Sequence, residues 1–224
     1  MITTVREGYR VWSASYDRSP NPVIALEART VAPLLSGLAG KRVLDAACGT
    51  GRWLEFAQAV GARAAGIDLS REMLLQAAAK NGLSGRLAEA DLRILPLATG
   101  SVDVAICSLS LGYVPSAEDA MRELARVTAA GGMIIASDLH PAALRSGWKR
   151  SFCTNGRTYE IQHYCYSVPA LLAAAKRLGL RLLDLKEPHF GEPERAIFDS
   201  AGVLHRFAEA SSVRAIWVAR WQRC

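Results

Sequence analysis

The sequence has little lysine and no concentrated positive charge. Lysine supplies 5 of the 27 basic residues and arginine the other 22, which give a net charge of +6 but are scattered singly along the chain. No block of about five or six like charges occurs, as a basic nucleic-acid arm would show. No run approaches the roughly 18 apolar residues of a membrane span, and the start MITTVREGYR resembles no signal peptide. We expect a cytoplasmic protein without nucleic-acid or membrane partners.

Cysteine is also sparse, and its spacing excludes two kinds of scaffold. The count is odd and no C-x-x-C pair occurs, so a disulfide framework and a structural zinc site are disfavoured. We expect no metal site and a reducing compartment in which all thiols stay reduced. The five cysteines are Cys48, Cys107, Cys153, Cys165 and Cys224.

Half of the 224 residues are hydrophobic and 21% are charged, which excludes a disordered chain. From residue 41 on, short apolar runs alternate with segments of helical period, a pattern typical of a parallel sheet covered by helices on both faces. Strands are predicted at 42–47, 63–67, 86–90, 102–109 and 133–139, and helices at 52–60, from Ser70 on, and at 117–128, the last ended by Gly131–Gly132.

The alternation changes after residue 141. Residues 145–166 alternate polar and apolar around Asn155–Gly156, which is a strong signal for a β-hairpin. A helix at 168–178 and a strand at 180–187 follow, then a long loop or short helix at 188–212. The last strand, 213–221, has no crossover helix of normal length before it, so we expect it to be an antiparallel edge strand.

One turn carries the strongest chemical signal, in the segment VLDAACGTGR at 43–52. A strand ends at an acidic residue, and a turn containing Gly49 and Gly51 leads directly into a helix whose N-terminus offers free N–H groups. The G-x-G-x-x-G pattern of dinucleotide binding fails, because Leu54 or Arg52 stands at the third glycine position. A phosphate-binding P-loop fails too, because no Gly-Lys-Ser/Thr follows.

The segment D-A-A-C-G-T-G resembles the acidic-x-Gly-x-Gly-x-Gly signature of class I S-adenosylmethionine-dependent methyltransferases, with Ala47 in place of the first glycine. Further landmarks follow in the order of that family: GIDLS at 66–70, EADL at 89–92 and SVDVAICS at 101–108. Upstream, Y-x-x-W at 9–12 and YD at 16–17 resemble its cofactor-covering segment. The likeness covers residues 5–140 and is nearest to the small-molecule branch that includes quinone-biosynthesis enzymes.

The resemblance implies a role for each acidic landmark. Asp68 would accept hydrogen bonds from both ribose hydroxyls, Asp91 would accept from the adenine amino group, and Asp45 would hold the methionine ammonium. A helix cap at Asp68 and a turn at Asp91 are the alternatives, and Asp103 is expected to tie down a loop. The cofactor-binding residues expected in all are Tyr16, Asp45, Ala47, Cys48, Gly49, Gly51, Asp68, Leu69, Met73, Asp91, Leu92 and Ser108.

The candidates for a catalytic base stand at the ends of strands. His140 is preferred because imidazole titrates near neutral pH, although an orienting or structural role is the alternative. Tyr113 is the second candidate, at a position where many relatives carry histidine. Glu187 and His189 follow the sixth strand. No Asn-Pro-Pro-aromatic motif follows the fourth strand, which disfavours methylation of adenine or cytosine in nucleic acid.

The hairpin suggests where an acceptor binds. A two-residue turn at Asn155–Gly156 fixes the register of the hairpin, in which the residue numbers of each cross-strand pair sum to 311. In this register one face of the hairpin is aromatic and the opposite face is polar. We expect the aromatic face to line the acceptor site, with the hairpin acting as a lid. The alternative is that the hairpin is a flap packed on the core. The predicted acceptor-binding residues are Trp148, Phe152, Tyr159 and His163.

Together these patterns predict one α/β domain with a Rossmann-like, seven-stranded, mostly parallel sheet and an antiparallel last strand. Residues 1–40 would cover the cofactor, 41–140 bind it, 141–167 form the hairpin lid after the fifth strand, and 168–224 complete the sheet. The predicted function is S-adenosylmethionine-dependent methyl transfer to a small molecule, leaving S-adenosylhomocysteine, by a monomer or homodimer. A cofactor-binding subunit without activity, or a nucleic-acid methyltransferase, is the alternative.

Overall fold

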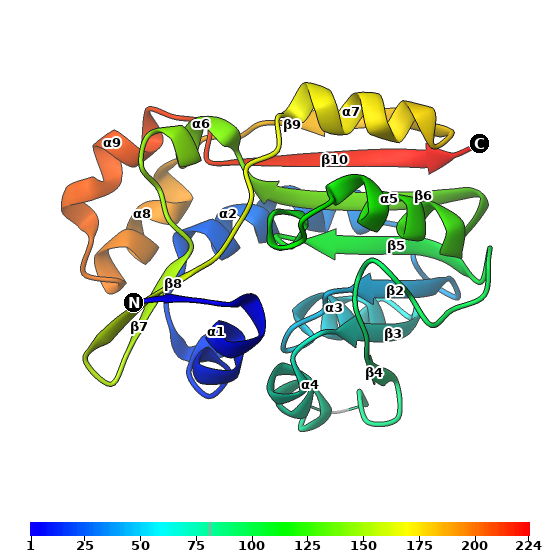
Figure 1. Cartoon of the computed structure of the whole chain (residues 1–224), viewed down its shortest axis with the longest axis horizontal. Coiled ribbons are helices and arrows are strands. Elements are labelled where there is room, and N and C mark those ends of the chain that lie inside the picture. The colour runs from blue at the N-terminus through cyan, green and yellow to red at the C-terminus, as the bar shows by residue number, and fades with distance from the viewer. Residues whose placement is uncertain (81) are drawn as a thin grey trace.

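A seven-stranded sheet forms the centre of the computed structural model, which describes residues 1–80 and 82–224 (Figure 1). The strand order is β4-β3-β2-β5-β6-β10-β9. The strands span β2 Arg42–Ala46, β3 Arg63–Asp68, β4 Leu87–Glu89, β5 Val102–Ser108, β6 Thr128–Leu139, β9 Leu180–Lys186 and β10 Ile216–Arg223. The sequence-based prediction of a seven-stranded Rossmann-like sheet is confirmed.

The strand directions also agree with the prediction, with one correction. Strands β4, β3, β2, β5 and β6 are parallel, and β10 runs antiparallel to both of its neighbours, β6 and β9. The last strand is therefore antiparallel as expected, but it lies inside the sheet, and β9 forms the edge. Trp217 and Trp221 of β10 are both buried, in the core between the sheet and the helices α5 and α7.

Helices pack on both faces of this sheet. Alternate residues of each strand feed two separate cores: Val43, Val104 and Ile135 face α2 and α3, while Leu44 and Ala105 face α5 and α7. The helices span α1 Val5–Trp12, α2 Pro22–Val31, α3 Arg52–Ala59, α4 Arg71–Ala78, α5 Ala117–Val127, α6 Pro141–Arg145, α7 Val168–Arg177, α8 Glu192–Ser200 and α9 Phe207–Ser211. Among the residues described, none of these helices has the length and apolar character needed to cross a bilayer.

Polar side chains fix where the helices begin and end. Ser70 caps α4 by accepting the Met73 N–H, and Ser116 caps α5 in the same way. The helix predicted at 117–128 ends at Val127, where Thr128 turns extended and its hydroxyl bonds the Leu124 carbonyl. Gly131–Gly132 therefore does not terminate the helix, as the sequence suggested, but lies within β6.

A second, small sheet carries the hairpin. Its strands are β7 Ser151–Thr154 and β8 Arg157–Ile161, and β1 Ile2–Thr3 adds to β8 in parallel. The predicted hairpin register is confirmed by the pairs Thr154–Arg157 and Phe152–Tyr159. The pairing does not extend to Trp148 and His163, because the two chains part beyond Arg150 and Ile161. Figure 1 shows the hairpin beside α1, with the N-terminus against it.

The cysteines give a direct test of this packing. All five are free, with Cys48 and Cys107 buried and Cys153, Cys165 and Cys224 exposed. We expect a thiol reagent to modify the three exposed cysteines in the native protein and all five in denaturant, as counted by mass spectrometry. Recovery of a Cys153–Cys165 disulfide from freshly purified protein would contradict both the hairpin register and the expected reducing compartment.

Candidate active site

A deep cleft opens at the carboxyl ends of β2, β3 and β5, under α1. Open parallel sheets bind their ligands at this edge. Its empty volume, counted out to the mouth, is about 1030 Å³. The cleft is lined by every predicted cofactor-binding residue except Gly51: Tyr16, Asp45, Ala47, Cys48, Gly49, Asp68, Leu69, Met73, Asp91, Leu92 and Ser108. The structure thus brings together side chains that lie up to 92 positions apart in the chain (108 − 16).

The two glycines of the turn are required for different structural reasons. Gly49 has φ +55° and lies in the cleft wall, where a Cβ would come within 3.3 Å of Met73 Cε. Gly51 has φ +84°, and a Cβ there would stand only 2.8 Å from Leu83 Cδ1. Gly51 is therefore required by packing against the segment after α4, and not, as the sequence suggested, by the approach of a ligand.

Asp68 supports the glycine turn from the end of β3. One carboxylate oxygen accepts the Gly49 N–H at 2.7 Å and the other accepts the Ser70 N–H at 2.8 Å. Burial raises the pKa of this carboxyl group. Ser70 itself supplies the cap of α4, so capping does not account for Asp68. Each carboxylate oxygen has a further lone pair with which it can accept a ligand hydroxyl.

Asp91 also lines the cleft and is held by a neighbouring side chain. The Arg93 guanidinium hydrogen-bonds the Asp91 carboxylate at 2.6 Å and lowers its pKa. Leu92 and Met73 are buried beside it and provide apolar walls. A flat heteroaromatic ring can fit between these apolar side chains while an amino group donates to Asp91.

Two buried polar atoms in the cleft, one on an acidic and one on a basic side chain, lack hydrogen-bond partners among the described residues. Asp45 is buried, and its Oδ1 has no hydrogen-bond partner among the described residues. The Nη1 of Arg52 is buried and unpaired within that same part of the chain. Burial raises the pKa of Asp45 to about 8, against the opposing effect of the Arg52 charge. An ammonium and a carboxylate on one small molecule would satisfy both groups, so these residues fit the amino-acid end of S-adenosylmethionine.

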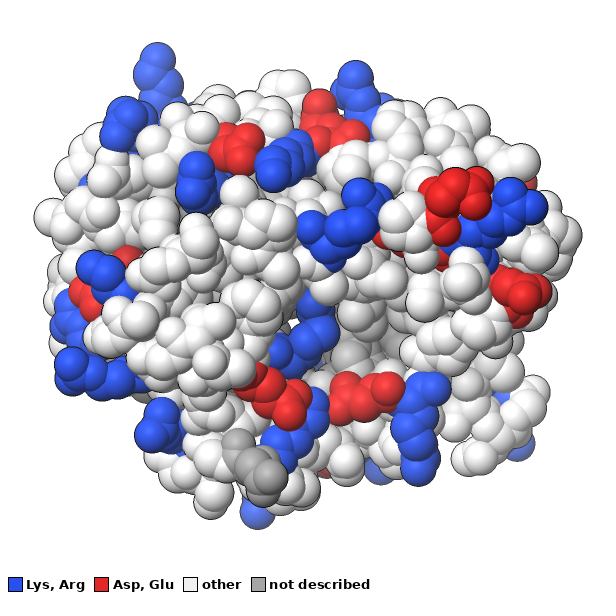
Figure 2. Space-filling view, turned by 180° about the vertical axis from the view of Figure 1, so that it is seen from behind, with Lys and Arg blue, Asp and Glu red and all other residues white. Residues whose placement is uncertain are grey.

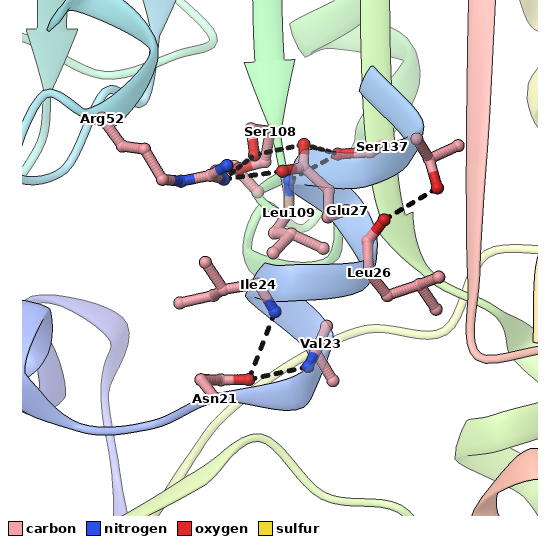
Figure 3. Close-up of polar contacts among 11 residues, drawn as sticks. Asn21, Val23, Ile24, Leu26, Glu27, Arg52, Ser108, Leu109 and Ser137 are labelled. Atoms are coloured by element: carbon pink, nitrogen blue, oxygen red, sulfur yellow. Dashed lines mark hydrogen bonds and ion pairs between the residues drawn. The ribbon is translucent and has the colours of Figure 1, made fainter. Parts of the chain in front are cut away.

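Arg52 is fixed by a buried network that the sequence did not reveal (Figure 3). Its Nη2 donates to Glu27 Oε2 at 2.6 Å, and the hydroxyls of Ser108 and Ser137 donate to Glu27 Oε1 at 2.8 and 2.9 Å. Glu27 is fully buried on α2. The only signal for it was an acidic residue within the apolar stretch PVIALEARTV at 22–31.

A pair of tyrosines stands at the inner end of the cleft. Tyr9 on α1 donates its hydroxyl to the hydroxyl of Tyr113 at 2.9 Å, and both rings line the cleft. The Arg150 guanidinium lies 4.3 Å from the centre of the Tyr113 ring. Burial raises the pKa of Tyr9 well above its usual range, so its hydroxyl stays protonated. Of this pair the sequence named only Tyr113 as a catalytic candidate.

His140, the preferred candidate for a general base, does not line the cleft. Its Nδ1 accepts the Ala142 N–H at 3.0 Å, which caps α6, and its Nε2 lies 2.8 Å from Glu187 Oε1. With Nδ1 accepting, Nε2 must carry the proton and donate it to Glu187. Neither nitrogen is then free to take a proton from an acceptor, so the geometry favours the structural role over the catalytic one.

The predicted acceptor-binding face of the hairpin divides into two parts. Phe152 stacks on Trp12 of α1 with ring centres 4.6 Å apart, and Tyr159 stacks on Phe152 at 5.2 Å. These two rings hold the hairpin to α1 and do not line the cofactor cleft. His163 Nδ1 lies 3.1 Å from the Ile161 carbonyl. Trp148 lines a second cavity, which lies beyond the cleft.

Comparisons with known proteins relate this fold and cleft to methyltransferases. Residues 44–136 match the family model described as "Methyltransferase domain". The malonyl-[acyl-carrier protein] O-methyltransferase of Pectobacterium atrosepticum is 34% identical over 120 residues, which cover 52% of this chain and 47% of the relative. The resemblance to class I S-adenosylmethionine-dependent methyltransferases that the sequence predicts is confirmed.

Solved structures extend the likeness over most of the chain. An S-adenosylmethionine-dependent methyltransferase from Mesorhizobium loti matches with a TM-score of 0.71 and 24% identity, over 91% of this chain and 100% of that one. The geranyl diphosphate C-methyltransferase of Streptomyces coelicolor, solved with S-adenosylhomocysteine, matches with a TM-score of 0.64 and 17% identity, over 90% and 82%. These likenesses establish the fold, while the chain spans about half the length of the curated relatives it matches.

Proposed function

We propose that this protein transfers a methyl group from S-adenosylmethionine to a small-molecule acceptor. The observation that carries the proposal is the pair of buried atoms without hydrogen-bond partners among the described residues, the acceptor Asp45 Oδ1 and the donor Arg52 Nη1, in the cleft of a methyltransferase fold. Burying such groups without partners is costly, so their retention in one cleft favours a ligand that carries both complementary charges.

The cleft offers a contact for each part of this cofactor. Asp45 would accept from the ammonium, Arg52 would donate to the carboxylate, Asp68 would accept from the ribose hydroxyls and Asp91 from the adenine amino group. When bound, the cofactor supplies a methyl group on an already activated sulfonium. The chain's own residues therefore need chiefly to orient the acceptor and exclude water.

The inner end of the cleft is suited to that task. Tyr9 and Tyr113 lie on the wall between the cofactor cleft and the next cavity, and their hydroxyls can orient a polar acceptor atom. Tyr113 can take part in this without a formal base, because a proton need leave the acceptor only when its nucleophilic atom carries one. Trp12, Tyr16 and Phe152 pack together beside this pair and supply apolar ring surface that can limit the access of water.

Calorimetry tests the cofactor assignment. We expect S-adenosylhomocysteine to bind and NADH not to bind, and Asp68→Ala to weaken S-adenosylhomocysteine by about 1.5–3 kcal/mol, as for hydrogen bonds to a charged group. Asp103→Ala is the matched control, because Asp103 is paired with Arg42 and does not line the cleft. Binding of NADH in preference to S-adenosylhomocysteine would overturn the proposal.

Two alternatives remain to be tested by function. A cofactor-binding subunit without activity would bind S-adenosylhomocysteine but methylate no acceptor unless a second protein is added. A nucleic-acid methyltransferase would bind RNA or DNA with a steep salt dependence. On the face shown in Figure 2, basic and acidic side chains are interspersed around a hollowed surface, which favours a small acceptor over a phosphate backbone.

A further inference from the structure

Two more cavities continue from the cofactor cleft under the hairpin. The middle cavity shares four of its lining residues with the cleft: Tyr9, Tyr16, Leu109 and Tyr113. The outer cavity shares five with the middle one: Pro22, Val23, Lys149, Ser151 and Val203. Their empty volumes, counted out to the mouth, are about 940 and 900 Å³. The cofactor cleft and the two cavities thus form one continuous row from β2 to α9.

The walls of this row are mainly apolar, and its outer end is aromatic. Trp148 stacks on Phe190 with ring centres 5.6 Å apart, and Phe190 meets Phe198 edge-on at 4.9 Å. Val203 stands at the junction of the middle and outer cavities, and Ala210 closes the far side. A long row of cavities with apolar and aromatic side chains along it, leading away from a cofactor site, has the shape to take a hydrocarbon chain.

Charge distinguishes the two ends of the row. Arg150, in the middle cavity, is buried and neutralised by Asp138, so it offers no net charge to a ligand. The outer cavity is lined by Lys149 and Arg206 against a single acid, Glu209. Lys149 also reaches Glu160 at 2.7 Å, but that pair is exposed and can exchange for a ligand anion at little cost. The outer end is therefore more positive than the cofactor cleft, whose lining carries three acids, Asp45, Asp68 and Asp91, against the two arginines Arg52 and Arg93.

We propose that the two cavities bind the acceptor, and that this acceptor is an elongated, largely apolar molecule with an anionic group at the end remote from the methyl donor. The proposal deepens the function proposed above and rests on it. The reacting end lies at the Tyr9–Tyr113 pair, the hydrocarbon passes Val203, and the anionic group reaches Lys149 and Arg206. Trp148 then contacts the acceptor, while Phe152 and Tyr159 position the wall from behind.

Binding of simple amphiphiles to the full chain tests this assignment. The probes are hexanoate, dodecanoate and dodecyltrimethylammonium below their micelle concentrations, measured by calorimetry with S-adenosylhomocysteine present. We expect dodecanoate to bind at least about 30-fold more tightly than hexanoate, because each buried methylene adds to the affinity. Dodecyltrimethylammonium should bind at least about fivefold more weakly than dodecanoate, since the outer wall carries excess positive charge.

Variants locate the binding to these cavities. Val203→Trp fills the junction and should abolish the preference for dodecanoate over hexanoate. Leu204→Trp, a bulky change at the exposed adjacent residue, should keep it. Trp148→Ala, which removes wall area without filling space, should weaken dodecanoate about tenfold and leave S-adenosylhomocysteine within twofold.

Each outcome decides one point. Equal affinity for the two chain lengths in the unmodified protein, equal behaviour of Val203→Trp and Leu204→Trp, or preference for the cationic probe would overturn the acceptor assignment. Failure of S-adenosylhomocysteine to bind the unmodified protein would instead overturn the proposed function itself.

Discussion

Replacing Arg52 by methionine is expected to lower the free energy of unfolding by about 3–5 kcal/mol. The reason is Glu27, which is fully buried and would lose its only cationic partner in the part of the chain that the structure describes. Breaking one side of a buried ion pair leaves an uncompensated charge, and this costs far more than the pair contributes. Urea denaturation of the two proteins at pH 7 measures the difference.

A second substitution separates the charge from the packing. In Arg52→Met with Glu27→Gln, no charge is left buried, and the Ser108 and Ser137 hydroxyls can still donate to the amide oxygen. Most of the lost stability should return. If the double variant is as unstable as Arg52→Met alone, the arginine acts through its stem and not through its charge.

The stable double variant also isolates the role of Arg52 toward the cofactor. We expect it to bind S-adenosylhomocysteine about 10- to 150-fold more weakly, the loss of one hydrogen bond to a charged group. Binding of 5′-methylthioadenosine, which lacks the amino-acid part, should be unchanged. An equal loss for both ligands would place Arg52 away from the ligand carboxylate.

The strands of the sheet and the parallel direction of most of them were predictable, because both depend on local sequence patterns. The first four parallel strands, β2 to β5, end at an acidic or small residue, and helices between the strands begin at caps such as Ser70 and Ser116. The place of β10 between β6 and β9 was not predictable, because strand order depends on contacts between distant segments. Its two buried tryptophans were present in the sequence, but they also fit an edge strand covered by a helix.

The residues of the site also divide into those that could be predicted from the sequence and those that could not. Asp45, Gly49 and Asp68 were identifiable because their spacing along two successive βα units fixes their place at one edge of the sheet. Glu27 and Tyr9 were missed, since no local pattern says that α2 brings an acid to β5 and β6, or that α1 brings a hydroxyl to Tyr113. His140 was preferred as the catalytic base because it stands at the end of a strand, where side chains often face the cleft. In the structure its Nδ1 instead caps the following helix, α6.

Binding of S-adenosylhomocysteine at pH 7 is expected to release close to one proton, and Asp45→Asn to abolish the release. Burial raises the pKa of Asp45 to about 8, so the carboxyl group is mostly protonated at pH 7 in the free protein. A ligand ammonium beside it favours the carboxylate and lowers that pKa. Calorimetry in phosphate and in Tris, whose ionisation enthalpies differ, measures the number of protons released.

The same carboxyl group makes the stability of the free protein depend on pH. In the unfolded chain the pKa of an aspartate is about 3.9, so between roughly pH 4 and 8 the folded state holds a proton that the unfolded state has lost. The stabilisation from this proton is therefore complete below the unfolded pKa and is lost as the pH rises through the folded one, with a slope of up to about 1.4 kcal/mol per pH unit.

Asp45→Asn, which mimics the protonated form, should lose that part of the slope and be the more stable protein at pH 8. Asp68 keeps its own contribution in both proteins, because burial raises its pKa as well. Identical slopes for the two proteins from pH 5 to 8 would mean that Asp45 is already ionised in the free cleft, and that no proton is exchanged when the cofactor binds.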